Sequence, residues 1–238
     1  MAPLTWTTLF KEKSDTPFDK VSSSLPELTT PHAYRDGVVW SLTREGLVIG
    51  SDALEATKGD PETVRKIWRN FQTSLETWSA VFGVPVELIM ATICTESGGD
   101  PTEVREEPGY ISDEKTPNRV SPGLTHTLIS TAREVLGNND VNRAWLLVPD
   151  NAIRAGTGYI ARNWKVTHFD PPKVACAYNA GGVYYNDKPQ NRWRMRQYPI
   201  GTSAHADRFI KWFNDCFRMF DLDKVSPATS FFRLLRER

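Results

Sequence analysis

The strongest pattern in the chain is a helical spacing of apolar residues that begins just after residue 60. Apolar side chains recur at steps of three and four, at Val64, Ile67, Trp68, Phe71, Leu75, Trp78 and Phe82. This spacing predicts an amphipathic helix, and Asp60 followed by Pro61 supplies an N-cap and a proline at the first helical position. Residues 85–97 come next and are apolar nearly all round, so we predict a buried central helix that ends at Gly98 and Gly99.

Further helical patterns follow, separated by turn residues. They cover residues 124–136, 140–147, 150–164 and 170–178, and a last long helix carries Phe209, Trp212, Phe213, Cys216 and Phe220. Residues 1–35 are polar and rich in proline, and we interpret them as an irregular arm. Residues 36–49 hold two short apolar runs around Arg44-Glu45-Gly46, which predicts a β-hairpin. The charged, proline-rich residues 100–122 are predicted to form a loop.

We therefore predict a mainly α protein in three parts. These are an arm plus hairpin at residues 1–60, one helical domain at residues 61–222 and a tail at residues 223–238. The tail places four apolar residues beside three arginines. This pattern favours a helix folded back onto the domain, and it is also compatible with an element that binds a partner or a membrane surface.

The composition excludes several classes of protein. Apolar residues make up 39% of the chain, which is enough for a core, so a wholly disordered chain is excluded. The 29 basic residues balance the 29 acidic ones, so we expect no nucleic-acid partner, since such proteins normally carry excess positive charge. The most apolar stretch, residues 81–95, contains Glu87 and is shorter than the about 18 apolar residues that a membrane span needs. We therefore expect no transmembrane segment.

The cysteines and the first residues point to a reducing compartment. Cys94, Cys176 and Cys216 are predicted to be small buried side chains, not disulfide partners. The first residues lack the basic region, the apolar run and the cleavage site of a secretory signal, so we expect synthesis in the cytoplasm.

Glu96 is the most informative ionisable residue, because it lies near the carboxyl end of the predicted buried helix. There the apolar neighbours and the negative end of the helix dipole both disfavour the charged carboxylate. Both effects raise the pKa and keep a proton available near neutral pH, as a general acid requires. Taken alone, the position also fits a glutamate that simply reaches solvent at a helix end.

Four short motifs occur in a fixed order around Glu96. Glu96-Ser97 is followed by Gly123-Leu124, then by Pro149, Ile153, Gly156 and Tyr159-Ile160, and last by Ala177-Tyr178-Asn179-Ala180-Gly181. In this order the motifs resemble the catalytic domain of soluble lytic transglycosylases and goose-type lysozymes, over roughly residues 75–185. The resemblance implies a lysozyme-like helical fold with peptidoglycan glycan strands as the partner and substrate.

By this resemblance, Glu96 protonates the oxygen of the β-1,4 bond between N-acetylmuramic acid and N-acetylglucosamine. It then takes a proton from the muramyl 6-hydroxyl, which closes a 1,6-anhydro ring without an activated water or a second carboxylate. Tyr178 resembles the tyrosine that hydrogen-bonds this glutamic acid, and Ser97 is implied to orient it. The saccharide groove is implied to be lined by Gly123, Leu124 and Asn179.

Two positions depart from the family pattern. A Met-Gln pair that contacts the sugar is Thr125-His126 here, so sugar specificity is expected to differ, with His126 in place of an amide group. The asparagine four residues before Gly156 is replaced by Ala152, which is expected to alter only packing. The first departure keeps open a non-catalytic protein of the same fold that binds the wall, as in a phage particle or a secretion apparatus.

Hydrolysis is the main alternative to transglycosylation. An inverting glycosidase places a second carboxylate about 6.5–9.5 Å from the acid to hold a water. Candidates crowd the segment after Glu96, at Asp100, Glu103, Glu106, Glu107, Asp113 and Glu114. We take Asp113 as the possible second carboxylate and nearby Tyr110 as a groove residue, although the segment also fits a solvated loop. The enzyme would then be a muramidase, or a chitinase acting on chitin-like oligosaccharides.

A cationic cluster near the end of the resemblance fits two interpretations. Lys188, Arg192, Arg194 and Arg196 surround Trp193. They fit contacts to the carboxylates of a cell-wall strand, with Trp193 stacked on a sugar face, and they fit equally a solvated loop.

Other chemistries find little support in the sequence. A cysteine protease built on Cys94 is disfavoured, because a thiol inside an apolar helix is not activated. His32, His168 and His205 show no metal-ligand spacing with the cysteines, so we expect no metal and no cofactor. Without a secretory signal, we expect delivery to the wall by phage lysis, within a virion or by a dedicated secretion system.

Overall fold

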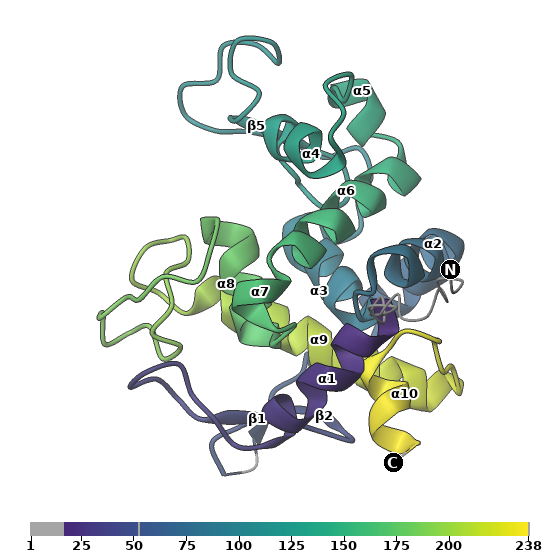
Figure 1. Ribbon diagram of the computed structural model, residues 1–238, viewed down its shortest axis with the longest axis vertical. Helices are drawn as coiled ribbons and strands as arrows, with labels where there is room; N and C mark the ends of the chain where they lie inside the picture. Colours follow the sequence, from purple (N-terminus) through teal and green to yellow (C-terminus); the bar gives the residue numbers. More distant parts are fainter. Residues whose placement is uncertain (1–16, 52, 238) are drawn as a thin grey trace, which may run out of the picture.

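The computed structural model describes residues 17–51 and 53–237, and this part of the chain is mainly helical (Figure 1). The helices are α1 (Pro17–Thr29), α2 (Glu62–Phe82), α3 (Val86–Glu96), α4 (Ile129–Leu136), α5 (Arg143–Leu146), α6 (Pro149–Arg162), α7 (Trp164–Thr167), α8 (Pro171–Ala180), α9 (Ala204–Asp223) and α10 (Phe231–Arg236). The strands are β1 (Trp40–Thr43), β2 (Gly46–Ile49), β3 (Ala53–Leu54), β4 (Val104–Glu106) and β5 (Val120–Pro122). The predicted mainly α fold with a small hairpin near the N-terminus is confirmed.

Helix α3 lies at the centre and packs against α2, α6, α8 and α9. Every residue from Val86 to Thr95 is buried, as expected for a helix without a polar face. Glu87 is among them, and its Oε1 accepts a hydrogen bond from the backbone N–H of Phe232 at 2.8 Å. The helix ends at Glu96, so the predicted central helix over 85–97 is confirmed to within one residue, and it carries Glu96 to the edge of the core.

The interpretation of residues 1–35 as an irregular arm is wrong for residues 17–29 and holds for residues 30–35, which form no helix or strand. Residues 17–29 form α1, and Val21, Leu25 and Leu28 are buried at helical spacing against the main core. The sequence hides this helix because serines occupy its second turn and Pro26 lies inside it, and both disfavour a helix interior. The remainder of the predicted arm, residues 1–16, lies outside the described residues.

The predicted hairpin is present and is held by α9. Strands β1 and β2 pair antiparallel, with Trp40 opposite Ile49, and β3 adds to β2. The side chain of Asn214 in α9 accepts a hydrogen bond from the backbone N–H of Leu47 and donates to the carbonyl oxygens of Leu47 and Glu55. Two strands alone are barely stable, and these contacts supply the support that the hairpin needs.

A smaller unit, formed by β4, β5, α4 and α5, stands at the top of Figure 1 and is called the upper lobe here. An apolar cluster packs this lobe against α6 and consists of Val120, Ile129, Ala132, Val141, Leu146 and, from α6, Ala155. The prediction of a loop over 100–122 missed the antiparallel pair β4–β5, because strands of three residues give no readable alternation. The helix predicted to begin at Leu124 begins only at Ile129, so residues 123–128 form a loop.

The tail folds back onto the domain, as predicted. Phe231, Phe232, Leu234 and Leu235 of α10 are buried, and the ring of Phe232 packs edge-on against Phe217 and Phe220 of α9. One core cluster joins α1, the hairpin, α3, α9 and α10. Among the described residues, no helix combines the length and apolar character needed to cross a membrane. Cys94, Cys176 and Cys216 are buried and unbonded to one another, as predicted.

Candidate active site

Glu96 is the last residue of α3, and its carboxyl group lies at the boundary between core and solvent. The side chain is 12% exposed. Burial raises the pKa of Glu96 to about 7, with a further rise from Glu103 that is opposed by the cations Arg208 and Arg105. The expectation of a protonated carboxyl near neutral pH therefore has its cause chiefly in desolvation.

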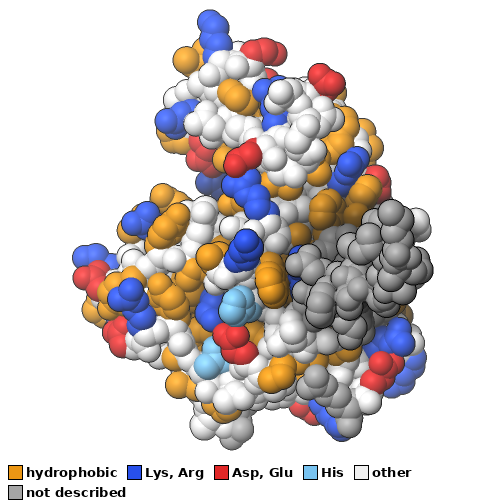
Figure 2. Space-filling view, in the orientation of Figure 1, with side chains coloured by type: hydrophobic (Ala, Val, Ile, Leu, Met, Phe, Trp, Pro, Cys, Tyr) orange, Lys and Arg blue, Asp and Glu red, His pale blue; other side chains and the backbone are white. Residues whose placement is uncertain are grey.

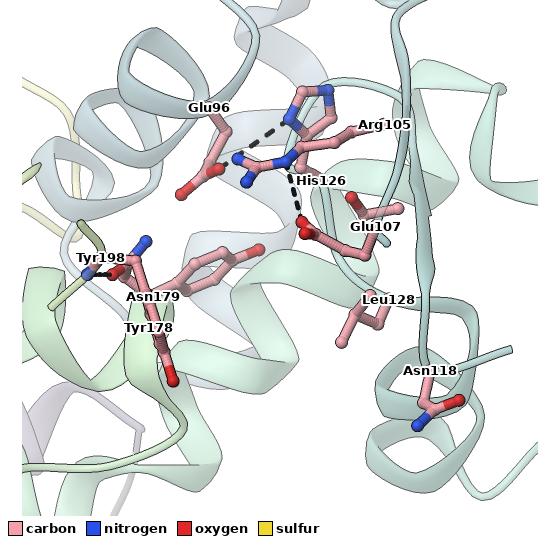
Figure 3. Close-up of a pocket in the computed structure, with 10 residues that line it drawn as sticks. Glu96, Arg105, Glu107, Asn118, His126, Leu128, Tyr178, Asn179 and Tyr198 are labelled. Atoms are coloured by element: carbon pink, nitrogen blue, oxygen red, sulfur yellow. Dashed lines mark hydrogen bonds and ion pairs between the residues drawn. The ribbon is translucent and has the colours of Figure 1, made fainter. Parts of the chain in front are cut away.

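A cavity of about 420 Å³ opens beside this carboxyl group, which is within the range of a small-molecule site. It lies between the upper lobe and the end of α8, where the outline of the molecule is notched (Figure 2). Its walls are formed by Glu96, Arg105, Glu107, Asn118, Ser121, His126, Leu128, Tyr178, Asn179 and Tyr198. Figure 3 shows Glu96 with His126 and Arg105 on one side, and Tyr178 and Asn179 across from them.

Two histidine rings flank the carboxyl group of Glu96. His126 Nδ1 lies 3.8 Å from Oε2, and His205 Nε2 lies 3.8 Å from Oε1. Burial lowers the pKa of His126, and it lowers the pKa of His205 to about 4, with a smaller contribution from Arg208. Both rings are therefore neutral at pH 7, so they place no positive charge on the carboxyl group that would pull its pKa down.

His126 is held in a strained backbone conformation. Its φ is +43°, in the left-handed region that costs a residue with a Cβ on the order of 1 kcal/mol or more. Neither ring nitrogen, both of them buried, has a hydrogen-bond partner, so the ring is free to bind a group that enters the cavity. Such strain and unused hydrogen-bonding capacity are common where a residue serves a ligand.

Tyr178 lines the cavity, but the hydrogen bond expected from it to Glu96 is not made in the structure. Its hydroxyl donates to the carbonyl oxygen of Thr125 at 2.8 Å and contacts the hydroxyl of Thr127, also at 2.8 Å. Burial raises the pKa of Tyr178 well above its usual value, so the hydroxyl keeps its proton. Tyr178 thus fixes the loop that carries His126, and its ring forms the cavity wall close to Glu96.

Ser97, Gly123 and Leu124, predicted to orient Glu96 or line the groove, form the support of the cavity and are absent from its walls. Ser97 Oγ donates to the carbonyl oxygen of Leu124 at 2.7 Å, which ties the end of α3 to the loop. Leu124 is fully buried in the core. Gly123 has a φ of +76°, and a Cβ at this position would lie 2.2 Å from the carbonyl oxygen of Leu146, so only glycine fits.

The two departures from the family pattern meet in space. Thr125 Oγ1 donates a hydrogen bond to the carbonyl oxygen of Ala152 at 2.9 Å. The Thr125 side chain also fills the space beside Gly156, where an added Cβ would lie 2.7 Å from it. The change to threonine therefore alters packing behind the loop, whereas the change to His126 alters the wall of the cavity.

The candidate second carboxylate, Asp113, belongs to a separate network in the upper lobe. Its carboxylate accepts hydrogen bonds from Arg143, at 2.8 and 3.0 Å, and from the hydroxyl of Tyr110 at 2.7 Å. The Arg143 guanidinium lowers the pKa of Asp113. The structure places neither Asp113 nor Tyr110 on the cavity wall, and it places Glu107 there instead.

The stacking role predicted for Trp193 is wrong. The side chain is fully buried, and its Nε1 donates to Asp207 at 2.7 Å. Two of the four surrounding cations are likewise engaged, because Arg192 pairs with Glu55 and Asp207 while Arg194 pairs with Asp36. A short segment in one sequence does not reveal which side of a tryptophan faces the core, so the error could not be seen from the pattern alone.

Several functional candidates were not singled out from the sequence. Arg105, which pairs with Glu107 at 2.8 Å, projects from β4 into the cavity. Tyr198 also lines the cavity, and this residue is 53% exposed. The backbone N–H of Tyr198 donates to the side chain of Asn179, which joins the two on one wall. Among residues 17–51 and 53–237, no group of three or more acidic, histidine or cysteine residues is arranged to hold a metal ion.

Comparison with known families identifies the family of this chain. Residues 74–198, more than half of it, match the model of the transglycosylase SLT domain. The protein therefore belongs to the SLT transglycosylase domain family, whose general activity is the degradation of peptidoglycan. The match spans Glu96, His126, Tyr178 and Asn179, and it leaves out α1, the hairpin, α9 and α10. No curated protein matches the chain.

Proposed function

We propose that this protein is a lytic transglycosylase that cleaves the β-1,4 bond between N-acetylmuramic acid and N-acetylglucosamine with Glu96 as its single acid and base. The observation that carries the proposal is the Glu96 carboxyl group, which borders the cavity and has a pKa raised to about 7 by burial. Family membership supports the general activity. The position of Glu96 beside the cavity supports its role as the group that gives and takes the proton.

The reaction balances with one carboxyl group. Glu96 gives its proton to the glycosidic oxygen as the bond from that oxygen to C1 of the muramyl sugar breaks. The neighbouring acetamide group of the same sugar stabilises the positive charge that develops at C1. The muramyl 6-hydroxyl then attacks C1 and returns its proton to Glu96, which restores the acid and leaves a 1,6-anhydro ring.

The walls of the cavity suit a sugar chain that carries negative groups. Tyr198 presents a half-exposed ring on the side of Asn179, and aromatic rings pack well against the apolar face of a sugar. Arg105 faces it from the upper lobe and is suited to the lactyl or peptide carboxylates of peptidoglycan. These two side chains take the roles that were expected of Trp193 and its neighbouring arginines.

The substitution Glu96→Gln tests the role of the acid. It keeps the size of the side chain and removes the transferable proton, so we expect loss of cell-wall clearing by at least about 100-fold with an unchanged circular dichroism spectrum and melting temperature. Exposed Glu76 on α2 provides the matched control, because Glu76→Gln removes a carboxylate far from the cavity and should leave clearing intact. Full clearing activity in Glu96→Gln would refute the proposal.

Product analysis by mass spectrometry separates transglycosylation from hydrolysis. Anhydro ends, lighter by one water than reducing ends, are the expected result. Hydrolysis has a specific observation in its favour, since the carboxylate of Glu107 lines the same cavity and could hold a water. Reducing ends that disappear in Glu107→Gln would establish that alternative, release of chitooligosaccharides would identify a chitinase, and wall binding without cleavage would identify a non-catalytic protein.

A further inference from the structure

His205 lies beside the candidate acid although it is outside the segment that matches the family. The match ends at residue 198, and His205 is the second residue of α9. Its side chain is 5% exposed, and its Nε2 lies 3.8 Å from Oε1 of Glu96. The two residues come from helices that are more than 100 positions apart in the sequence, and the close packing of α3 on α9 brings them together.

The first turn of α9 is fixed firmly enough to give His205 a defined position. The buried side chain of Gln197 accepts a hydrogen bond from the backbone N–H of Ala206 at 2.9 Å. Ser203 Oγ accepts from the backbone N–H of Arg192 at 2.8 Å and donates to the carbonyl oxygen of Gln190. Because its neighbours on both sides are held, the imidazole remains next to the carboxyl group.

The separation of 3.8 Å is longer than a hydrogen bond by less than 1 Å. Hydrogen bonds at catalytic groups are often long without substrate and shorten when substrate is bound. No side chain donates a hydrogen bond to Glu96 within the described chain. His126 Nδ1 approaches its Oε2, and His205 Nε2 its Oε1, to 3.8 Å each. A small rotation of either side chain would turn such a contact into a hydrogen bond.

Several charged groups around Glu96 already affect its pKa, and they limit the effect that the neutral ring of His205 can have. Arg208 on α9 and Arg105 on β4 lower its pKa, Glu103 raises it, and the Tyr178 hydroxyl from α8 is occupied by Thr125 and Thr127. A further cation against the carboxyl group would hold it ionised and remove the acid. A neutral imidazole instead offers an N–H while the carboxyl group keeps its proton.

We propose that His205 is a positioning residue of the proposed transglycosylase, whose imidazole N–H holds Oε1 of Glu96 during the interval in which Glu96 is a carboxylate. The inference rests on the proposed function. After Glu96 has given its proton to the glycosidic oxygen, His205 donates a hydrogen bond to Oε1 and keeps the carboxylate oriented toward the incoming 6-hydroxyl. The ring neither gains nor loses a proton, so the overall proton transfer is unchanged.

Two substitutions separate this role from simple packing. His205→Leu fills the buried space without a donor, whereas His205→Gln keeps an N–H donor. With soluble glycan strands we expect His205→Leu to lower kcat about 10-fold to 100-fold with little change in KM. Loss of the donor disfavours the carboxylate, so the alkaline limb of the pH profile of kcat/KM should move up by about one pH unit. His205→Gln should leave the alkaline limb of the pH profile in place and retain most of kcat.

A control and a second measurement keep the inference testable. His168, which is half-exposed and pairs with Glu27, gives the control His168→Leu, which should change neither kcat nor the limb. The carboxyl titration of Glu96, observed by carbon NMR and assigned with Glu96→Gln, should shift upward in His205→Leu whether or not product is formed. An unmoved titration in a folded His205→Leu protein overturns the inference. A protein that releases no anhydro product overturns the proposed function alone.

Discussion

In the proposed reaction, the carboxyl group of Glu96 is an acid before the glycosidic bond breaks and a base afterwards. A pKa near pH 7 suits both tasks, because neither form is then strongly disfavoured. The pKa is raised because Glu96 is the last residue of a buried helix. The apolar core surrounds it on one side, and the cavity borders it on the other. The rings of His126 and His205 are neutral, so they add no positive charge that would hold Glu96 ionised.

The pH dependence of the reaction follows from this pKa. The proposed mechanism needs the protonated form of Glu96 in the free enzyme, and this form is lost as the pH rises through about 7. We expect kcat/KM on soluble glycan strands to be level below pH 7 and to fall about 10-fold for each pH unit well above it. The measurement is a pH–rate profile with melting temperature recorded at each pH. A fall that begins between about pH 4 and pH 5 would show that the buried glutamate titrates like an exposed one.

Chemical type and order along the chain identified Glu96, His126, Tyr178 and Asn179, and all four line the cavity. The same reasoning missed His205 and Tyr198, because nothing near them in the sequence signals that their helix or loop returns to the acid. It erred on Trp193, whose burial depends on contacts with α9 and the hairpin. Residues that act through local motifs can be predicted from sequence, whereas residues placed by long-range packing cannot.

The loop of residues 123–128 carries His126 and is held from several directions. Ser97 holds it to the end of α3, Tyr178 holds it to α8, and Thr125 holds it to α6 through Ala152. Gly123 turns the chain into the loop from β5, with Leu146 close on one side. The loop is therefore a rigid wall, and its hydrogen bonds explain why Ser97 and Gly123 belong to the motif without touching the cavity.

The substitution Gly123→Ala should damage both stability and activity. Alanine is disfavoured at a φ of +76°, and its Cβ would overlap the carbonyl oxygen of Leu146. We expect a loss of about 2 kcal/mol or more in the free energy of unfolding, measured by urea denaturation, and a lower kcat from displacement of His126. Gly137→Ala is the matched control. Its φ is +60° with no atom near the added Cβ, so only about 1 kcal/mol should be lost, and kcat should be retained. Equal effects of the two substitutions would contradict the account.

Element by element, the helices with clear apolar spacing were predictable. The spacing located α2, α3, α8 and α9, each of which buries a regular set of side chains. It failed for α1, where serines and Pro26 obscure three buried residues, and for β4 and β5, which are three residues long. These elements gain their stability from neighbours that are distant in sequence, so no local pattern could reveal them.

A buried or half-buried glutamate lies at each end of the central helix α3. At one end Glu96 borders the cavity, and at the other the buried Glu87 binds the backbone of α10. Burial raises the pKa of Glu87 to about 7, although hydrogen bonds from Phe232 and Phe231 oppose the rise. Its second oxygen has no partner. The tail is thus held by Glu87, and burial in the folded protein favours the protonated form of its carboxyl group.

Stability should therefore fall as the pH rises from about 5 to 7. In this range the unfolded chain has released the Glu87 proton while the folded chain still holds it, so the unfolded state is favoured increasingly with pH. Glu87→Gln removes the titration, and we expect the pH-dependent loss in the free energy of unfolding to shrink by on the order of 2 kcal/mol. Urea denaturation at pH 5 and pH 8 provides the measurement, with Glu76→Gln as the exposed control. An identical loss in Glu87→Gln and the unsubstituted protein would exclude Glu87 as its source.

The long helix α9 has a consequence for where this catalytic unit begins and ends. Its apolar side covers α3, and its Asn214 is hydrogen-bonded to the hairpin. A fragment trimmed to residues 74–198, the segment that matches the family model, would expose one side of α3 to solvent and would lack His205, whose ring lies beside Glu96. We therefore expect the smallest piece of the chain that folds on its own to extend beyond residues 74–198, because α9 supplies one side of the packing around α3.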